Sequence, residues 1–255
     1  MTRLTSSTSS VPSPSSVPAP SPAGPPVGGG RRGVLALGLA ALASAAAVPV
    51  ARAGAAPRVT AAPPGPRGAA RALAELRAGN ARFAALRQRH PHEDAGRRSA
   101  VAVAQHPFAV VLGCVDSRVP PELVFDQGLG DLLSIRTAGQ ALDEAVLGSV
   151  QFGVEELDVR LVVVLGHERC GAATAAVEYV RTGVPVSGHL ARVVEELAPA
   201  ARAARGLPGD WVENTVRCHV DRVRTRLAGD AAFSGAEVVG ARFDLETGRV
   251  AFHPS

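Results

Sequence analysis

Two short runs of Val and Leu constrain the fold of this chain, because each is followed at once by residues that bind metals. The first run, 108–113, precedes Cys114, and the second, 161–166, precedes His167. Such runs are typical of strands that are buried on both faces of a parallel sheet. The carboxyl ends of parallel strands meet at one edge of the sheet, so we expect these two segments to bring their polar side chains together there.

The rest of the chain alternates between strand and helix patterns. This predicts an α/β fold with a mostly parallel central sheet flanked by helices and closed by a C-terminal hairpin. Further strands are expected at 132–136, 238–244 and 249–252. Helices are expected at 69–87, 122–125, 144–157, 171–181, 190–204 and 211–227, and a polar loop is expected at 90–96.

The first 53 residues are typical of an export signal. A Ser/Pro-rich stretch is followed by Arg31 and Arg32, by an apolar run over 33–50 and by a small-residue cleavage site at 51–53. The paired arginines favour the twin-arginine export machinery, so we expect a secreted, periplasmic or cell-envelope protein. A membrane anchor is the less favoured alternative, because the apolar run is rich in Ala and Gly and barely long enough to span a bilayer. Residues 54–68 are predicted to be a flexible linker, and residues 69–255 a single folded domain.

Charge and cysteine content exclude two classes of protein. The formal net charge of +4 equals the charge of the four arginines at positions 3, 31, 32 and 52, so the folded domain is near neutral and no nucleic-acid partner is expected. Three cysteines are too few for a disulfide framework in a domain of this length. Cys218 is expected to be a small core residue. Its neighbour His219 resembles a second metal ligand, but adjacent residues of a helix point apart.

Four side chains around the two strand ends predict a zinc site. Cys114, His167 and Cys170 supply two thiolates and an imidazole, and Asp116 can supply a carboxylate. The spacing of His167 and Cys170 lets both side chains approach a metal from one turn. Gly171 then permits a tight backbone at the start of the next helix.

Asp116 has two possible partners, with different consequences. If it binds zinc, the site is closed and structural. If it pairs with Arg118, the fourth zinc position is open to water, whose pKa zinc lowers to about 7. The bland alternative is that Asp116 and Arg118 form a surface salt bridge of little energetic importance.

These motifs together resemble the β-class carbonic anhydrases. The matching segments are C-x-D-S-R followed by V-P-P-E (114–122), G-D (130–131), R-x-A-G (136–139) and G-H-x-x-C-G (166–171), and the resemblance extends over about 69–253. It implies that residues 69–255 are a catalytic domain for the reversible hydration of carbon dioxide to bicarbonate and a proton. It also implies one Zn²⁺ per chain, held by Cys114, His167 and Cys170.

The resemblance further implies roles for residues around the metal. Asp116 and Arg118 would be the catalytic Asp–Arg pair, and Gln105 would bind substrate. The family forms tight dimers with pockets at the subunit interface, so a homodimer or a dimer of dimers is implied. The chain departs from many members at three positions, where it has Val111 for Trp, Thr137 for Asn and Phe152 for Tyr.

Two other functions use the same residues. A hydrolase of carbonyl sulfide or carbon disulfide would have the same fold and the same zinc ligands. A non-catalytic, zinc-stabilised binding protein would keep Asp116 permanently on the metal. The presence of Arg118 and Gln105 argues against the second alternative, and hydration of carbon dioxide is the favoured prediction.

Overall fold

A five-stranded sheet forms the centre of the domain in a computed structural model that describes residues 65–253. The strand order is β2-β1-β3-β4-β5, and all neighbouring pairs are parallel except the terminal hairpin of β4 and β5. The strands are β1 (Ala109–Cys114), β2 (Leu132–Thr137), β3 (Leu161–His167), β4 (Glu237–Phe243) and β5 (Val250–His253). The predicted fold class is confirmed. The predicted export signal over 1–53, and most of the linker over 54–68, lie outside the described residues.

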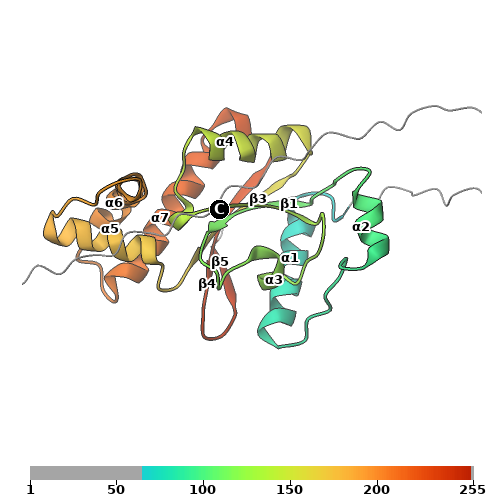
Figure 1. Ribbon diagram of the computed structural model, residues 1–255, viewed down its shortest axis with the longest axis horizontal. Coiled ribbons are helices and arrows are strands. Elements are labelled where there is room, and N and C mark those ends of the chain that lie inside the picture. Colours follow the sequence, from blue (N-terminus) through green and yellow to red (C-terminus); the bar gives the residue numbers. More distant parts are fainter. Residues whose placement is uncertain (1–64, 254–255) are drawn as a thin grey trace, which may run out of the picture. The chain divides into compact units, whose positions relative to one another are not determined.

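Alternating side chains of β1 and β3 pack into two separate cores, one on each face of the sheet. Val110 and Leu112 contact the core under α4, α5, α6 and α7, whereas Ala109 and Val111 contact the core under α1 and α3. Figure 1 shows α4 on one side of the sheet and α1 and α3 on the other. The helices are α1 (Ala69–Ala84), α3 (Pro121–Val124), α4 (Glu144–Gln151), α5 (Gly171–Thr182), α6 (Leu190–Ala204) and α7 (Trp211–Ala228).

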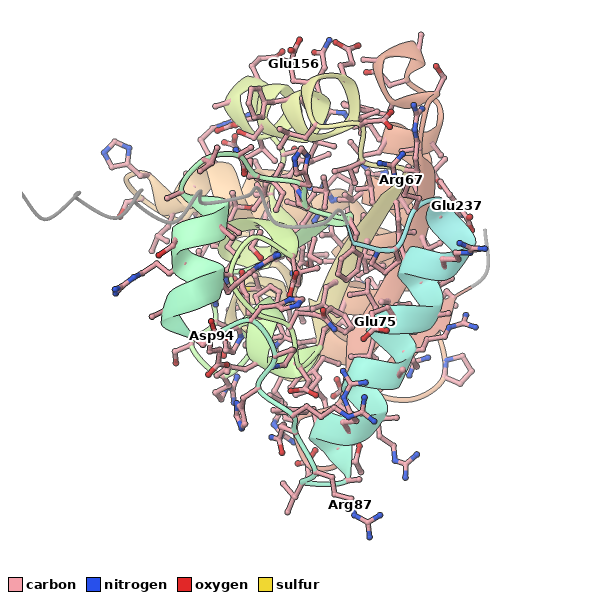
Figure 2. All side chains as sticks on the ribbon, turned by 90° about the vertical axis from the view of Figure 1, so that its right-hand side faces the viewer. Arg67, Glu75, Arg87, Asp94, Glu156 and Glu237 are labelled. Atoms are coloured by element: carbon pink, nitrogen blue, oxygen red, sulfur yellow. The ribbon has the colours of Figure 1, made fainter. Side chains whose placement is uncertain are left out.

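Helix α2 (Ala95–Val101) was not predicted, because the loop was expected to extend to residue 96. The helix buries none of its residues, so it has no apolar face that a pattern could reveal. Its start is fixed by Asp94, whose carboxylate accepts a hydrogen bond from the backbone N–H of Arg97. Figure 2 shows Asp94 at the beginning of α2, and Glu75 on the neighbouring α1.

The predicted helix over 144–157 is helical almost to its end, but it widens from α4 into a π-helical turn over Phe152–Glu156. The reason lies in Gly153, where an added Cβ would stand 2.6 Å from Val110 Cγ2 and 2.8 Å from Leu133 Cδ2. The backbone therefore packs directly on β1 and β2 at this point. The first helix is also shorter than predicted, since α1 ends at Ala84 rather than at residue 87.

Within residues 65–253, no helix combines the length and apolar character that a membrane crossing requires.

Strand register determines which residues meet at the carboxyl edge of the sheet. Gly113 of β1 lies opposite Leu165 of β3, so both strands end at nearly the same level. On the other side of β1, Cys114 lies opposite Thr137 of β2. The segments that follow all three strands therefore meet at one edge, as the sequence predicted for the first and third.

Candidate metal centre and active site

Cys114, His167 and Cys170 converge at the carboxyl edge of the sheet. All three are buried, and their donor atoms lie within 4.8 Å of one another. Cys114 and His167 are the last residues of β1 and β3, and Cys170 is the N-cap of α5. Two thiols and an imidazole on three rigid elements match the donor set of a tetrahedral zinc site with one position left for another ligand.

The imidazole of His167 is oriented as a metal ligand. Its Nδ1 lies 2.8 Å from the carbonyl oxygen of Glu168, and a carbonyl can only accept a hydrogen bond. Nδ1 therefore carries the proton, and the lone pair is on Nε2, which has no hydrogen-bond partner among the described residues although it is fully buried. A buried lone pair beside two thiols is the arrangement that a metal ion would complete.

The two thiols differ in acidity because each is hydrogen-bonded to the other and only one of them can donate. Hydrogen bonds from the Cys170 thiol and from the backbone N–H of Gly139 lower the pKa of Cys114 to about 4, against the effect of burial. Hydrogen bonding to the Cys114 sulfur, together with burial, raises the pKa of Cys170. Of the two thiols, Cys114 is therefore the one that ionises first. A dication would favour the loss of the second proton as well.

Asp116 faces Arg118 in this structure. The guanidinium donates two hydrogen bonds to the carboxylate, from Nε to Oδ1 at 2.9 Å and from Nη2 to Oδ2 at 2.7 Å, and the Arg118 backbone N–H donates to Oδ1 at 3.0 Å. These bonds hold the pKa of Asp116 well below its usual range. Oδ2 remains 3.9 Å from His167 Nε2, so the carboxylate stands beside the donor group without belonging to it.

Arg136 and Gly139 complete the site, and neither was among the predicted site residues. Arg136 donates from Nε to the carbonyl oxygen of Cys114 at 2.7 Å, and from Nη2 to that of Asp116 at 2.6 Å. The backbone N–H of Gly139 donates to Cys114 Sγ at 3.3 Å. Both lie in the R-x-A-G motif that supported the family resemblance. Their contacts follow from the pairing of Cys114 with Thr137, which the sequence does not give.

The structure does not bring Gln105 to the metal-binding side chains of its own chain. Gln105 is exposed and precedes β1, whereas Cys114 ends that strand. A six-residue strand spans about 17 Å. The two residues therefore lie at opposite ends of β1. Phe152, at the position of the family tyrosine, is exposed on the π-helical turn, and Val111 is fully buried.

The prediction that Cys218 is a core residue is wrong, because its side chain is partly exposed. The next residue of α7, His219, is the buried one, at 2% exposed. The two side chains form no joint site with another metal-binding residue among those described.

Comparison with known proteins identifies the family. The family model described as carbonic anhydrase matches residues 109–250, which is more than half of the chain. The chain belongs to the carbonic anhydrase family. Carbonic anhydrase 2 of Mycobacterium tuberculosis is 40% identical over 181 residues, covering 68% of this chain and 87% of the relative. A carbonic anhydrase of Mycolicibacterium smegmatis is 40% identical over 182 residues, covering 69% and 88%.

Solved structures show that this carbonic anhydrase has the fold of β-class members. A tetrameric β-carbonic anhydrase of Sordaria macrospora matches with a TM-score of 0.57 and 21% identity, covering 70% of this chain and 94% of the other. The β-carbonic anhydrase CcaA matches with a TM-score of 0.53 and 22% identity, covering 60% and 76%. At these identities the structures establish the shared fold, and the family itself rests on the sequence matches. The chain is an enzyme of carbon dioxide hydration.

Proposed function

We propose that this enzyme catalyses the zinc-dependent, reversible hydration of carbon dioxide to bicarbonate and a proton. The observation that carries the proposal is the buried group of Cys114, His167 and Cys170, next to an Asp116 that pairs with Arg118. The three side chains fit zinc by donor type, and His167 Nε2 offers an unused lone pair. When bound, zinc supplies the acidity that makes water a nucleophile near neutral pH.

Three residues around the donor group have separate roles. Arg118 holds both carboxylate oxygens of Asp116, which keeps this carboxylate from serving as a fourth ligand. Asp116 stays ionised and lies beside the donor group, so it can accept a hydrogen bond from a water molecule there and orient it toward the substrate. Arg136 fixes the backbone carbonyls on either side of Val115 and so keeps Cys114 and Asp116 in register.

The position of Gln105 supports a dimer whose active sites include residues of both subunits. Gln105 lies at the far end of β1 from its own Cys114 and is exposed. An amide that binds substrate, as the resemblance implies, would therefore act in the site of a second copy. We extend the proposal accordingly to a homodimer, alone or paired as a dimer of dimers, in which each chain supplies Gln105 to its partner.

Stopped-flow hydration of carbon dioxide, with zinc measured on the same sample, tests this function. The protein should contain about one zinc per chain, and Cys170→Ser or His167→Ala should lose both metal and activity. Parallel assays with carbonyl sulfide and carbon disulfide distinguish hydration of carbon dioxide from the hydrolase alternative. A folded and active protein without metal would refute the zinc proposal, and a zinc-loaded protein inert toward carbon dioxide would refute hydration.

We further propose that the chain is exported by the twin-arginine machinery. The support is the order of Arg31, Arg32, the apolar run over 33–50 and the small residues at 51–53, all of which lie outside the described residues. Replacing both arginines with lysine should retain the protein in the cytoplasm. Replacing Arg3 with lysine serves as the control and should leave export unchanged. Normal export of the double variant would point to the general secretory route.

A further inference from the structure

The G-D motif contributes a buried carboxylate that takes no part in the metal centre. Asp131 is 4% exposed and ends the turn that precedes β2, at the opposite edge of the sheet from the metal centre. Its carboxylate accepts hydrogen bonds from Arg97 Nη2 at 2.9 Å, from His92 Nδ1 at 2.7 Å and from the Gly128 N–H at 2.9 Å. These contacts compensate for the burial of the charge, and they tie three separate segments to one side chain.

The contact with Arg97 fixes helix α2 to this turn. Besides its ion pair with Asp131, the largely buried Arg97 donates from Nε to the carbonyl oxygen of Leu129 at 2.8 Å. Val101, the last residue of α2, packs on the same turn, because an added Cβ on Gly130 would stand 3.0 Å from its Cγ1. Since α2 buries none of its residues, these contacts hold it in place where an apolar face is lacking.

The backbone of Asp131 holds the start of β1 in the same way. The N–H of the buried Phe108 donates to the carbonyl oxygen of Asp131 at 2.9 Å. Asp131 therefore anchors both ends of the segment 102–107, which leads from α2 toward β1. Gln105 is an exposed residue of this segment, four residues after the end of α2 and three before Phe108. Its position depends on two anchors that meet at Asp131.

We propose that Asp131 is a positioning residue for Gln105. By fixing α2 and the start of β1 together, it sets the place of the Gln105 amide on the surface of the subunit. The inference rests on the proposed function, in which this amide binds substrate in the site of a second copy. Groups that orient a substrate act through precise placement, and a misplacement of about 1 Å can cost about 100-fold in rate.

Asp131→Asn tests this placement, because the amide keeps the shape of the carboxylate but presents a donor where three donors already converge. We expect kcat/KM for hydration of carbon dioxide to fall by about tenfold while the zinc content is unchanged. In a Gln105→Ala background the same substitution should cause no further loss, because the amide that it displaces is already absent. A merely structural loss would lower kcat/KM by the same factor in both backgrounds.

Asp126→Asn is the matched control. Asp126 is 3% exposed, and its carboxylate accepts hydrogen bonds from Arg82 Nε and from the backbone N–H groups of Arg89 and His90. None of these partners lies on α2 or β1, so the variant weakens a comparable buried network without releasing Gln105. Its kcat/KM should match wild type at a temperature where circular dichroism shows both proteins to be folded.

Three results would overturn the inference: a wild-type kcat/KM in Asp131→Asn, an equal fall in the two backgrounds, or an equal fall in Asp126→Asn. If Asp131→Asn does not fold, Arg97→Met, which releases α2 alone, replaces it with the same expected results. A Gln105→Ala protein with wild-type kcat/KM would refute the proposed role of Gln105 and the inference with it. An impaired Gln105→Ala beside a normal Asp131→Asn would refute the inference alone, which separates the two failures.

Discussion

At the scale of single residues, the proposed mechanism depends on which partner Asp116 binds. The carboxylate is bonded to Arg118 through both oxygens, yet one oxygen is 3.9 Å from the imidazole nitrogen that faces the metal-binding group. Its pKa is held well below the usual range, so this pair persists wherever the pH exceeds that lowered value. It is lost when acid protonates the carboxylate. Arg118 is half-exposed, and its importance comes from its partner rather than from burial.

Arg118→Ala should abolish most activity while leaving zinc bound. Without the guanidinium, Asp116 has the metal as its remaining strong partner, and a carboxylate on the fourth position excludes water. We expect the hydration rate near neutral pH to fall by at least about 100-fold, which is the lower end of the range for loss of one electrostatic partner. Stopped-flow rates with metal analysis check this. Near-normal rates would mean that Arg118 is a surface charge, and Arg181→Ala, which breaks an exposed ion pair on α5, is the control.

The sequence predicted that Cys114, His167 and Cys170 lie together, but it could not predict the residues that position them. Cys114, His167 and Cys170 follow buried strands, so pattern and chemistry coincide in the sequence. The role of Arg136 depends on two carbonyl oxygens at the end of β1, and the role of Gly139 on the distance to one sulfur. Both arise from the parallel pairing of β1 with β2, a long-range feature that has no local signal.

At the scale of elements, the strands were predicted well, whereas features that depend on packing between elements were not. All five strands were predicted to within one residue at each end, because Val-rich runs with neighbouring Gly are strong local signals. Helix α2 was missed because it buries nothing, and the π-helical turn because Gly153 meets Val110 and Leu133 from other elements. Helix boundaries that depend on contacts with other elements therefore cannot be predicted from the local sequence.

Two glycine-to-alanine changes measure this packing directly. At Gly79 on α1, an added Cβ would stand 1.8 Å from the carbonyl oxygen of Phe125, so α1 would have to move. We expect Gly79→Ala to lower the free energy of unfolding by about 3 kcal/mol, the upper end for overpacking. At Gly148 on α4 nothing lies within 4 Å, and Gly148→Ala should raise it by about 0.5–1 kcal/mol through helix propensity. Urea unfolding measures both, and equal effects would contradict the packing geometry.

At the scale of the whole molecule, the proposed site of one chain lacks the amide of Gln105. The metal-binding group, Asp116 and Arg118 lie at the carboxyl edge of the sheet, and Gln105 lies beyond its other edge. Proposed assembly of two chains would complete each site with an amide from the partner. Activity should then depend on chain concentration wherever the dimer dissociates.

Mixing two inactive variants tests whether Gln105 acts across the subunit interface. Gln105→Ala keeps an intact metal centre but lacks the amide, and Cys170→Ser has the amide but no complete centre. In a mixed dimer, the intact centre would receive Gln105 from the other chain. Co-refolding the two variants in equal amounts should therefore restore about a quarter of wild-type activity, because half of the dimers are mixed and each contains one complete site. No recovery, with mixed dimers confirmed by mass, would show that Gln105 acts within its own chain or not at all.

The separation of the metal ligands along the chain also has a consequence for the order of folding. Cys114 ends β1, whereas His167 and Cys170 follow β3, and the two strands become neighbours only after the segment that contains β2 and α4 has crossed over between them. Closing such a loop is slow compared with local helix formation. A nascent chain that has emerged as far as β2 carries one of the three ligands and has no site to fill. If the proposed zinc binds as argued, its binding follows the pairing of β1 with β3, so zinc would stabilise a sheet that has already formed rather than start its formation.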